Sequence, residues 1–191
     1  MTAASTPKGE RRRRALVEAA AELLDEGGFD AVRHRAVAER ASLPLASTTY
    51  YFGSLDELVT AAAEHHGRAE LVLGRARLAE LAAGPRDDEG VVELVLDALL
   101  GPATAGPEQV VLRYERFVAA ARRPWLAPLM RELRAELDGL LADALAHCEL
   151  PADRDRLDLL VAVVDGAVVN ALIEAAPDPR AAARRMLLRA L

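Results

Sequence analysis

The sequence has little that could cross-link the chain, carry it across a membrane or build a sheet. Cys148 is the only cysteine among 191 residues, so no disulfide can form within the chain, and a reducing compartment fits this count. Aromatic residues make up only 4%, which favours helix over sheet. The most apolar run, residues 159–173, is too short for an ordinary span and contains Asp165 and Asn170. The N-terminus has no signal-peptide core. We therefore expect a cytoplasmic protein without a membrane partner.

Residues that bind metals or carry out catalysis are equally sparse. His65 and His66 are adjacent, so on a helix they point in different directions and cannot share one ion. Residues 147–149 (His-Cys-Glu) are likewise neighbours rather than i,i+4 partners. Neither a nucleophile motif nor a glycine-rich phosphate loop occurs. We predict no metal, no cofactor and no enzymatic activity.

Charge is present but unevenly distributed. The chain has 30 acidic and 24 basic residues, a net charge of −6, and Lys8 is the only lysine. Residues 1–55 contain eight basic and seven acidic residues, a net of +1, which leaves −7 for the remainder. An acidic body with a locally basic end suits a protein that contacts DNA through one surface, although ordinary charge scatter could give the same numbers.

The spacing of apolar residues predicts an all-α fold. The hydrophobic content of 52% is enough for a packed core, and neither strand alternation nor a hairpin signal occurs. Gly-Gly, Gly-Pro and other proline-containing breaks divide the chain into about nine helices. The expected helices span about 10–25, 34–41, 45–51, 54–82, 87–100, 107–122, 125–148, 152–176 and 179–190.

Two of these helices form a recognisable pair. The helices at about 34–41 and 45–51 are separated by the tight turn at 42–44, which is a helix-turn-helix arrangement. A capping box follows, in which Ser54 caps the amide of Glu57 and Glu57 reaches back to the amide of Ser54. The next helix therefore has a defined start.

This order of elements resembles the TetR (tetracycline-repressor-like) family of transcriptional regulators. The resemblance rests on residues 36–54 and on Ala19-Ala20, Leu23-Leu24 and Gly28-Phe29 upstream. It is close over 10–63, and beyond that only the helix layout and the length match. It implies a helix-turn-helix DNA-binding domain at 1–54, built as a three-helix bundle, and a larger helical ligand-sensing and dimerisation domain at 55–191.

The sequence departs from the family pattern at three positions. Arg33 stands where a capping threonine is usual, and Ser42 replaces the common glycine of the turn. Leu55 replaces the lysine that normally follows Ser54, which removes an expected phosphate contact. DNA affinity is therefore either lower than is usual for the family or restored by the arginines.

The predicted DNA-binding residues lie on the two short helices. The run 45–49 is slim and rich in hydroxyls, so it can approach base edges. Tyr50 and Tyr51 offer hydroxyls to phosphates, although one of them is expected to anchor the helix with Phe52 instead. By resemblance, residues 33–35 contact phosphates. The predicted set is Arg33, His34, Arg35, Leu45, Ala46, Ser47, Thr48, Thr49, Tyr50 and Tyr51. Arg11 to Arg14 either add phosphate contacts or form a solvated basic patch.

The C-terminal half offers candidates for two further roles. The candidate ligand-binding residues, which combine aromatic and charged side chains, are Arg113, Tyr114, Phe117, Trp125 and Met130. An ordinary core with salt bridges at its edge is the alternative. The segment 157–176 is apolar almost all round, and the resemblance makes it part of an intersubunit four-helix bundle with 179–190. The candidate interface residues are Asp165, Gly166, Val169, Asn170 and Ile173; Asp165 and Asn170 either bond across the interface or face a ligand.

Taken together, these features predict a ligand-responsive DNA-binding regulator. We expect a repressor that binds a pseudo-palindromic operator in double-stranded DNA as a homodimer and is released by an unidentified small-molecule effector. The alternative is a helical protein-interaction module with a weak or vestigial DNA-binding head, supported by Leu55 and the mild local charge. The salt dependence of DNA binding separates the two.

Overall fold

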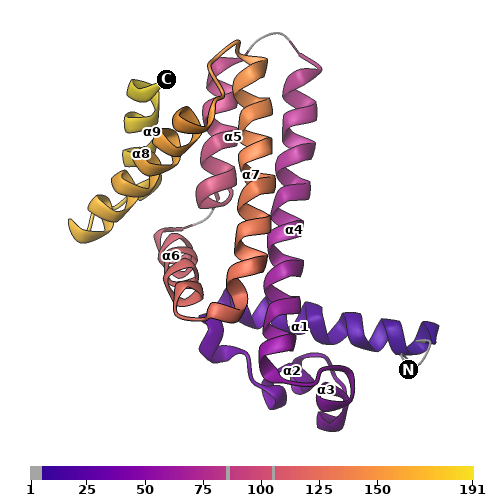
Figure 1. Ribbon diagram of the computed structural model, residues 1–191. Helices are drawn as coiled ribbons and strands as arrows, with labels where there is room; N and C mark the ends of the chain where they lie inside the picture. Colours follow the sequence, from indigo (N-terminus) through magenta and orange to yellow (C-terminus); the bar gives the residue numbers. More distant parts are fainter. Residues whose placement is uncertain (1–5, 85–86, 105) are drawn as a thin grey trace. The chain divides into compact units, whose positions relative to one another are not determined.

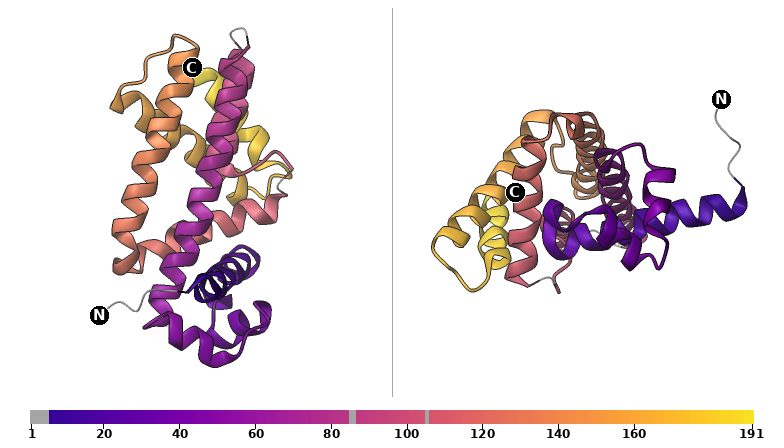
Figure 2. Two further views of the ribbon diagram at one scale, coloured as in Figure 1. Left: turned by 90° about the vertical axis from the view of Figure 1, so that its right-hand side faces the viewer. Right: turned by 90° about the horizontal axis from the view of Figure 1, so that it is seen from below.

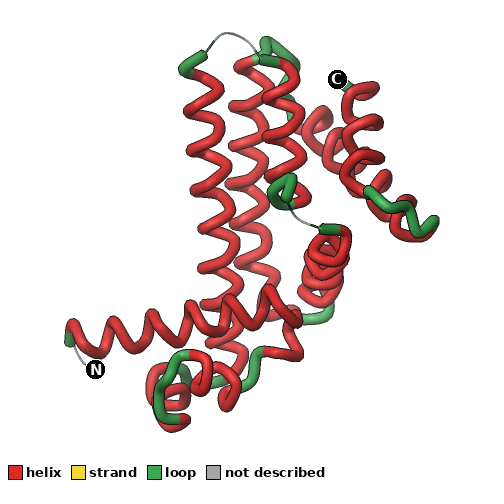
Figure 3. Tube along the Cα trace, turned by 180° about the vertical axis from the view of Figure 1, so that it is seen from behind, coloured by secondary structure: helices red, strands yellow, loops and turns green. Residues whose placement is uncertain are grey.

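The computed structural model describes residues 6–84, 87–104 and 106–191, and within these ranges the chain is helical without a strand (Figures 1 and 3). The helices are α1 (Pro7–Ala31), α2 (His34–Arg40), α3 (Leu45–Tyr51), α4 (Leu55–Ala82), α5 (Asp88–Leu100), α6 (Pro107–Ala121), α7 (Ala127–His147), α8 (Arg154–Ile173) and α9 (Pro179–Ala190), with a short 3₁₀ turn at Pro124–Leu126. The all-α prediction is confirmed, and the expected helices agree with these bounds to within a few residues except at α1.

The helices gather into two compact units, each with its own core. The first unit comprises the described part of Met1–Arg68 together with Glu115–Met130. The second comprises the described parts of Ala69–Tyr114 together with Arg131–Leu191. The chain passes between the units within α4, α6 and α7. The unit that contains the helix-turn-helix therefore includes a segment from the C-terminal half of the sequence, beyond the predicted boundary after residue 54.

Helix α1 is longer than expected and contains a break. It starts at Pro7 because the hydroxyl of Thr6 accepts a hydrogen bond from the amide of Gly9 at 3.1 Å. The predicted end near Asp25 corresponds to an interruption at Gly27 and Gly28, where Gly28 has φ +66°. Helical geometry then resumes as far as Ala31. The glycine pair turns the chain, as predicted, but does not end the element.

The first unit is built around apolar residues of α1, α2 and α4. Its fully buried members include Leu16, Ala20, Val37, Leu58 and Ala62, each 0% exposed. Phe52, which follows α3, is only 2% exposed and joins this core. The two helix-turn-helix elements are thus held in place by side chains that point inward, which leaves their other faces to solvent.

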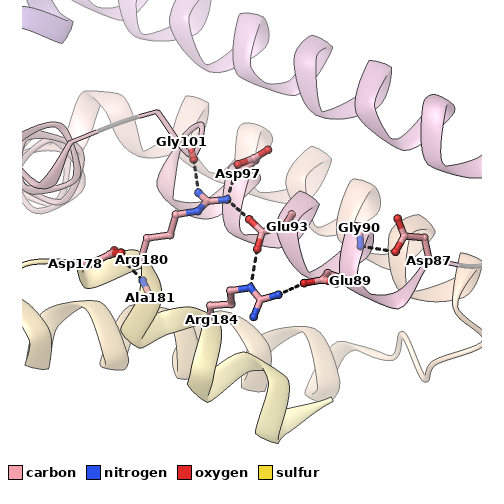
Figure 4. Close-up of polar contacts among 10 residues, drawn as sticks. All are labelled: Asp87, Glu89, Gly90, Glu93, Asp97, Gly101, Asp178, Arg180, Ala181 and Arg184. Carbon is pink, nitrogen blue, oxygen red and sulfur yellow. Dashed lines mark hydrogen bonds and ion pairs between the residues drawn. The ribbon is translucent and has the colours of Figure 1, made fainter.

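The second unit packs its most apolar helix, α5, against α7, α8 and α9. Helices α8 and α9 form a closely packed pair. Two arginines of α9 attach it to α5 (Figure 4): Arg180 lies 2.8 Å from Glu93 and 2.6 Å from Asp97, and Arg184 donates to Glu93 at 2.9 Å and pairs with Glu89. The position of α9 on α5 is therefore fixed by charge as well as by apolar packing.

Candidate nucleic-acid interface and ligand-binding residues

The turn between α2 and α3 adopts a left-handed backbone at a residue with a side chain. Ser42 has φ +53°, and the amide of Leu43 donates to the carbonyl of Ala38 at 2.9 Å. Glycine adopts such a conformation with less strain than a residue with a side chain. Ser42, which replaces the glycine common in the family, therefore adopts the left-handed backbone that glycine would favour. The turn is strained but hydrogen-bonded.

Helix α3 presents a slim outer face. Leu45 is 53% exposed and Tyr50 is 79% exposed, while Ala46 and Thr49 also lie on the surface and Ser47 is half-buried. None of these side chains is charged. A face of this kind can approach base edges closely, with hydroxyls and methyl groups as contact points.

Thr48 departs from the expectation for α3. It is 0% exposed, and its hydroxyl donates to the carbonyl of Leu45 at 2.8 Å. Thr48 lies four residues before the buried Phe52 and therefore on the same helix face. It supports α3 from inside and has no hydroxyl to offer to a base.

The two tyrosines at the end of α3 divide the roles that the sequence left open. Tyr51 is half-buried and packs against the core of the first unit, whereas Tyr50 is exposed. Their rings meet edge to face, with centroids 4.9 Å apart. Tyr51 is thus the anchor, and Tyr50 is the tyrosine whose hydroxyl is free to reach outward.

The basic residues of α2 differ in their availability. Arg33 is exposed at the start of the helix, gives no side-chain cap, and donates to the carbonyl of Asp30 at 3.1 Å. Arg35 is exposed and donates to Glu39 at 2.9 Å. His34 is half-buried. Arg33 and Arg35 therefore lie where solvent or a polyanion can reach them.

Arg40, by contrast, serves to hold the unit together. Its guanidinium lies 2.7 Å from Glu26 and 3.1 Å from Glu22, both on α1. These contacts, the Glu26 hydrogen bond first, raise the pKa of Arg40. The arginine thus links α2 to α1.

The capping box at α4 forms with one change of partner. The amide of Glu57 donates to the hydroxyl of Ser54 at 3.1 Å, as predicted. The carboxylate of Glu57, however, accepts from the amide of Gly53 at 2.8 Å rather than from that of Ser54. Leu55, where the family usually has lysine, packs its apolar side chain against the core of the first unit.

Three helices of the first unit meet at one carboxylate that the sequence did not reveal. Asp25 of α1 forms an ion pair with Arg116 of α6, and its second oxygen lies 3.4 Å from His66 Nδ1 of α4. Partial burial acts to raise the pKa of Asp25, but the contacts with His66 and Arg116 outweigh it and lower the pKa to about 2. Because 91 positions separate Asp25 from Arg116, no local pattern could indicate the pair.

The first unit also contains a shallow cleft beside the helix-turn-helix. It has a volume of about 210 Å³. Its apolar wall includes Phe29, Leu55 and Trp125, and polar side chains such as Arg33 and Arg123 line it too. The guanidinium of Arg123 lies 4.3 Å from the centroid of the Phe29 ring.

Two of the five candidate ligand residues lie in the second unit. Arg113 is only 7% exposed; it donates to the carbonyls of Leu99 at 2.8 Å and Ala98 at 3.0 Å and pairs with Glu70. Its guanidinium therefore satisfies the last turn of α5, which corresponds to the structural alternative considered for this residue.

Tyr114 makes a polar contact with a residue predicted for a different role. Its hydroxyl donates to Asp165 Oδ1 of α8 at 2.8 Å. Burial, and then the contact with Asp165, raise the pKa of Tyr114 above its ordinary value. Asp165 was a candidate for the subunit interface, and in this structure its carboxylate is bonded within the chain.

The other three candidates belong to the first unit. Phe117 is 44% exposed, Trp125 is half-buried against the core of the first unit, and Met130 is half-buried. The structure thus distributes the predicted ligand residues between the two units and does not gather them within either one.

The remaining interface candidates share an exposed face of α8. Gly166 and Asn170 are exposed, Val169 is 43% exposed and Ile173 is 77% exposed. The same face continues toward the start of the helix with exposed Leu159. On the neighbouring helix, α9, Met186 and Leu188 are also exposed.

The described ranges hold neither a metal-binding cluster nor a membrane-spanning helix. They contain no group of three or more side chains suited to hold a metal ion. Within the same ranges, no helix combines the length and the apolar character needed to cross a membrane.

Comparison with known proteins gives matches over nearly the whole chain. The family model "Bacterial regulatory proteins, tetR family" matches residues 16–62, and the model "Tetracyclin repressor-like, C-terminal domain" matches residues 86–191. The nicotine-responsive transcriptional repressor HdnoR of Paenarthrobacter nicotinovorans is 25% identical over 175 residues, which cover 88% of this chain and 87% of the relative.

Solved structures show the same fold. The multidrug binding protein EbrR in complex with proflavin is 31% identical, with a TM-score of 0.68 over 94% of this chain and 99% of that one. A TetR-family member from Streptomyces coelicolor A3 is 30% identical, with a TM-score of 0.64 over 94% and 98% of the two chains. EbrR has also been solved with ethidium and with malachite green.

Proposed function

The chain belongs to the tetR family of bacterial regulatory proteins, and from this membership we propose that it is an effector-released repressor that binds a pseudo-palindromic operator as a homodimer. Members of the family are DNA-binding transcription regulators rather than enzymes, in agreement with the sequence-based prediction. To this family membership we add a pseudo-palindromic operator, a homodimer and a small-molecule effector.

The observation that carries the DNA-binding proposal is the outer face of α3. Uncharged, slim side chains at Leu45, Ala46 and Thr49 can enter a major groove, where methyl and hydroxyl groups distinguish base pairs. Arg33 and Arg35, exposed at the start of the neighbouring helix α2, supply the charge that phosphates require. One helix thus reads sequence while its neighbour fixes the position of the protein on the duplex.

The homodimer proposal rests on the apolar outer face of α8 and α9. Leu159, Val169 and Ile173 follow one another along one side of α8 and are all more than 40% exposed. A second copy of the same face would bury them and form a four-helix bundle from two hairpins. Two-fold symmetry then requires two half-sites about 34 Å apart, which is one turn of the duplex.

The effector proposal rests on Tyr114 and Asp165 in the second unit. A carboxylate that accepts from a partly buried phenol provides charge, a hydrogen bond and an aromatic ring in one place. Nicotine, proflavin and ethidium, which are named with the relatives, are aromatic nitrogen compounds that carry or can gain positive charge. We therefore assign this pair to an aromatic cation or amine. For release, that ligand must bind the DNA-incompetent state more tightly.

Selection from a random duplex pool tests the DNA-binding proposal. The purified full-length protein is incubated with the pool at near-physiological salt, and the bound sequences are read. Enrichment of a pseudo-palindrome supports a dimeric operator-binding regulator. Failure to enrich any sequence by a folded protein contradicts the proposal and favours the protein-interaction alternative.

Direct titration tests the effector proposal. Proflavin and nicotine are added to the free protein, because proflavin itself binds DNA and would confuse an assay that contains it. We expect Asp165→Asn to weaken binding at least fivefold and Glu174→Gln, an exposed change at the end of α8, to leave it unchanged. Equal affinities for wild type and Asp165→Asn would contradict the assignment. In a second step, nicotine is added to the complex of the protein with its operator, and the release of the DNA is measured.

A further inference from the structure

The cleft beside the helix-turn-helix is lined by three segments of the first unit that are far apart in the sequence (Figure 2). They are the end of α1 with its link to α2, the start of α4, and the 3₁₀ turn with the arginine before it. The volume of about 210 Å³ lies below the range of roughly 300–1,000 Å³ that is typical of pockets for drug-sized ligands. The cleft therefore suits a small molecule with a single ring.

Aromatic and aliphatic side chains make up much of the lining of the cleft. Phe29 and Trp125 are half-buried, and Val32 and Val59 are buried. An aromatic ring gains free energy by leaving water, and it gains more when it meets other rings edge to face or in an offset stack. The lining therefore favours an aromatic ligand.

The charged side chains of the cleft differ in their burial. Asp30, Arg33 and Asp56 are exposed, so water and salt screen their charges. Arg123 is half-buried, and its guanidinium lies 4.3 Å from the centroid of the Phe29 ring. The least screened charge that a ligand meets in the cleft is therefore positive.

The half-buried guanidinium of Arg123 lacks an anionic partner in the protein. Its Nη1 donates to the carbonyl of Ala119, in the last turn of α6, at 2.9 Å. In the part of the chain that the structure describes, no carboxylate forms an ion pair with Arg123. A partly buried cation without an anion is unfavourable, and a guanidinium has several further N–H donors. A ligand with a negative charge would satisfy both the charge and these donors.

We propose that the cleft binds a single-ring aromatic carboxylate, whose ring packs against Phe29 and Trp125 and whose carboxylate accepts hydrogen bonds from Arg123. Arg33 lines the same cleft, and its Nε donates to the carbonyl of Asp30 at 3.1 Å. Within the described ranges, the terminal nitrogens of Arg33 have no acceptor. The planar fork of a guanidinium matches a carboxylate in geometry, so both arginines suit this ligand.

Arg33 connects the cleft to DNA binding, and this step rests on the proposed function. The same side chain is proposed to contact a phosphate, and a guanidinium that is held by a ligand carboxylate is no longer available to the DNA. A bound aromatic carboxylate therefore weakens DNA binding. The site is separate from Tyr114 and Asp165, which belong to the second unit and are assigned to a cation or amine.

The single tryptophan of the chain, Trp125, provides a direct test because it lines the cleft. Its indole N–H signal is followed in the nitrogen–proton NMR spectrum of the full-length protein while benzoate is added. We expect a saturable shift with benzoate, and affinities about tenfold lower for benzyl alcohol and benzylamine, which lack the negative charge. No saturable shift with benzoate, or equal affinities for benzoate and benzyl alcohol, would overturn the proposal.

Variants place the carboxylate within the cleft. Arg123→Gln is expected to weaken benzoate binding about tenfold, and Arg33→Gln, at an exposed position, about threefold. Arg122→Gln removes the exposed neighbouring arginine and should bind benzoate like wild type. Because Arg33 is exposed, its variant keeps the test valid even where Arg123→Gln does not fold. Wild-type affinity of Arg33→Gln for benzoate would contradict the proposed site.

Competition with DNA is measured by fluorescence anisotropy of the selected operator, with benzoate replacing chloride at constant ionic strength. At a benzoate concentration of about ten times its dissociation constant, the full-length protein should bind the operator about threefold or more weakly. Unaltered DNA affinity would overturn the shared role of Arg33. A protein that binds benzoate but no DNA contradicts the proposed function and supports the cleft, so the two failures are distinguishable.

Discussion

The outward faces of α3 and α8 differ in chemistry although both are exposed. The surface of α3 offers short side chains and hydroxyls, whereas that of α8 offers Leu159, Val169 and Ile173 with few polar groups. Hydrogen-bonding groups lose little in contact with a hydrated polyanion, whereas exposed apolar groups gain by leaving water. The comparison indicates that a nucleic acid suits the first surface and another protein surface suits the second.

The sharpest test of this comparison is a charge on the apolar surface. Replacement of Ile173 by Asp places an unpaired carboxylate in the proposed subunit contact, where burial costs about 3–5 kcal/mol. We expect the dimer dissociation constant to rise at least a hundredfold in sedimentation equilibrium. Leu73→Asp on α4, a residue with a similar exposure of 70%, is the control and should not change it. Unaltered association of Ile173→Asp would rule out the α8 face as the interface.

The next effect concerns the stability of the second unit. Arg113→Met keeps the length of the side chain but removes the donor for two carbonyls of α5 and the ion pair with Glu70. Because this site is buried, we predict a decrease of roughly 2–4 kcal/mol in the free energy of unfolding by urea. Arg122→Met, at an exposed position, should lower it by less than about 0.5 kcal/mol. Equal stability of the two variants would mean that Arg113 is not a structural residue.

A smaller effect separates two neighbours on α3. Ser47→Ala removes a hydroxyl from the proposed reading face and should change the preference at one base position by about 1 kcal/mol, roughly fivefold. Thr48→Val removes the hydroxyl bonded to the carbonyl of Leu45 and should lower stability by about 1 kcal/mol without altering the preference. Repeating the sequence selection with both variants checks this. A changed preference for Thr48→Val would contradict its internal position.

The smallest effect is a dependence on pH at Asp25. Its pKa is lowered to about 2 from 3.8, so the stabilisation is fully present above about pH 4 and is lost as pH falls through 2. Because the side chain is 52% exposed, the contribution is discounted to about 1 kcal/mol or less. Asp25→Asn should flatten the unfolding free energy between pH 4 and 2 by this amount, and the exposed change Asp30→Asn should not. Identical pH profiles for wild type and Asp25→Asn would contradict the role of this contact.

Local features of the sequence were predictable because local physics determines them. The helix limits other than those of α1, the turn at Ser42 and the cap at Ser54 all depend on residues within four positions of one another. Contacts between distant residues were not predictable, and Tyr114 with Asp165 is an example, with 51 positions between them. The inward position of Thr48 was missed because α3 has no apolar periodicity, although its spacing of four from Phe52 was a usable signal.

The measurement that tests the central claim most directly is the stoichiometry of the complex with the selected operator, determined by light scattering. The account predicts two chains of wild type on each full operator. It also predicts one chain of Ile173→Asp on each half-site, with affinity at least tenfold lower, because the apolar face holds the copies together while α3 binds the DNA. One wild-type chain on each operator, or two chains of Ile173→Asp bound as tightly as wild type, would contradict it.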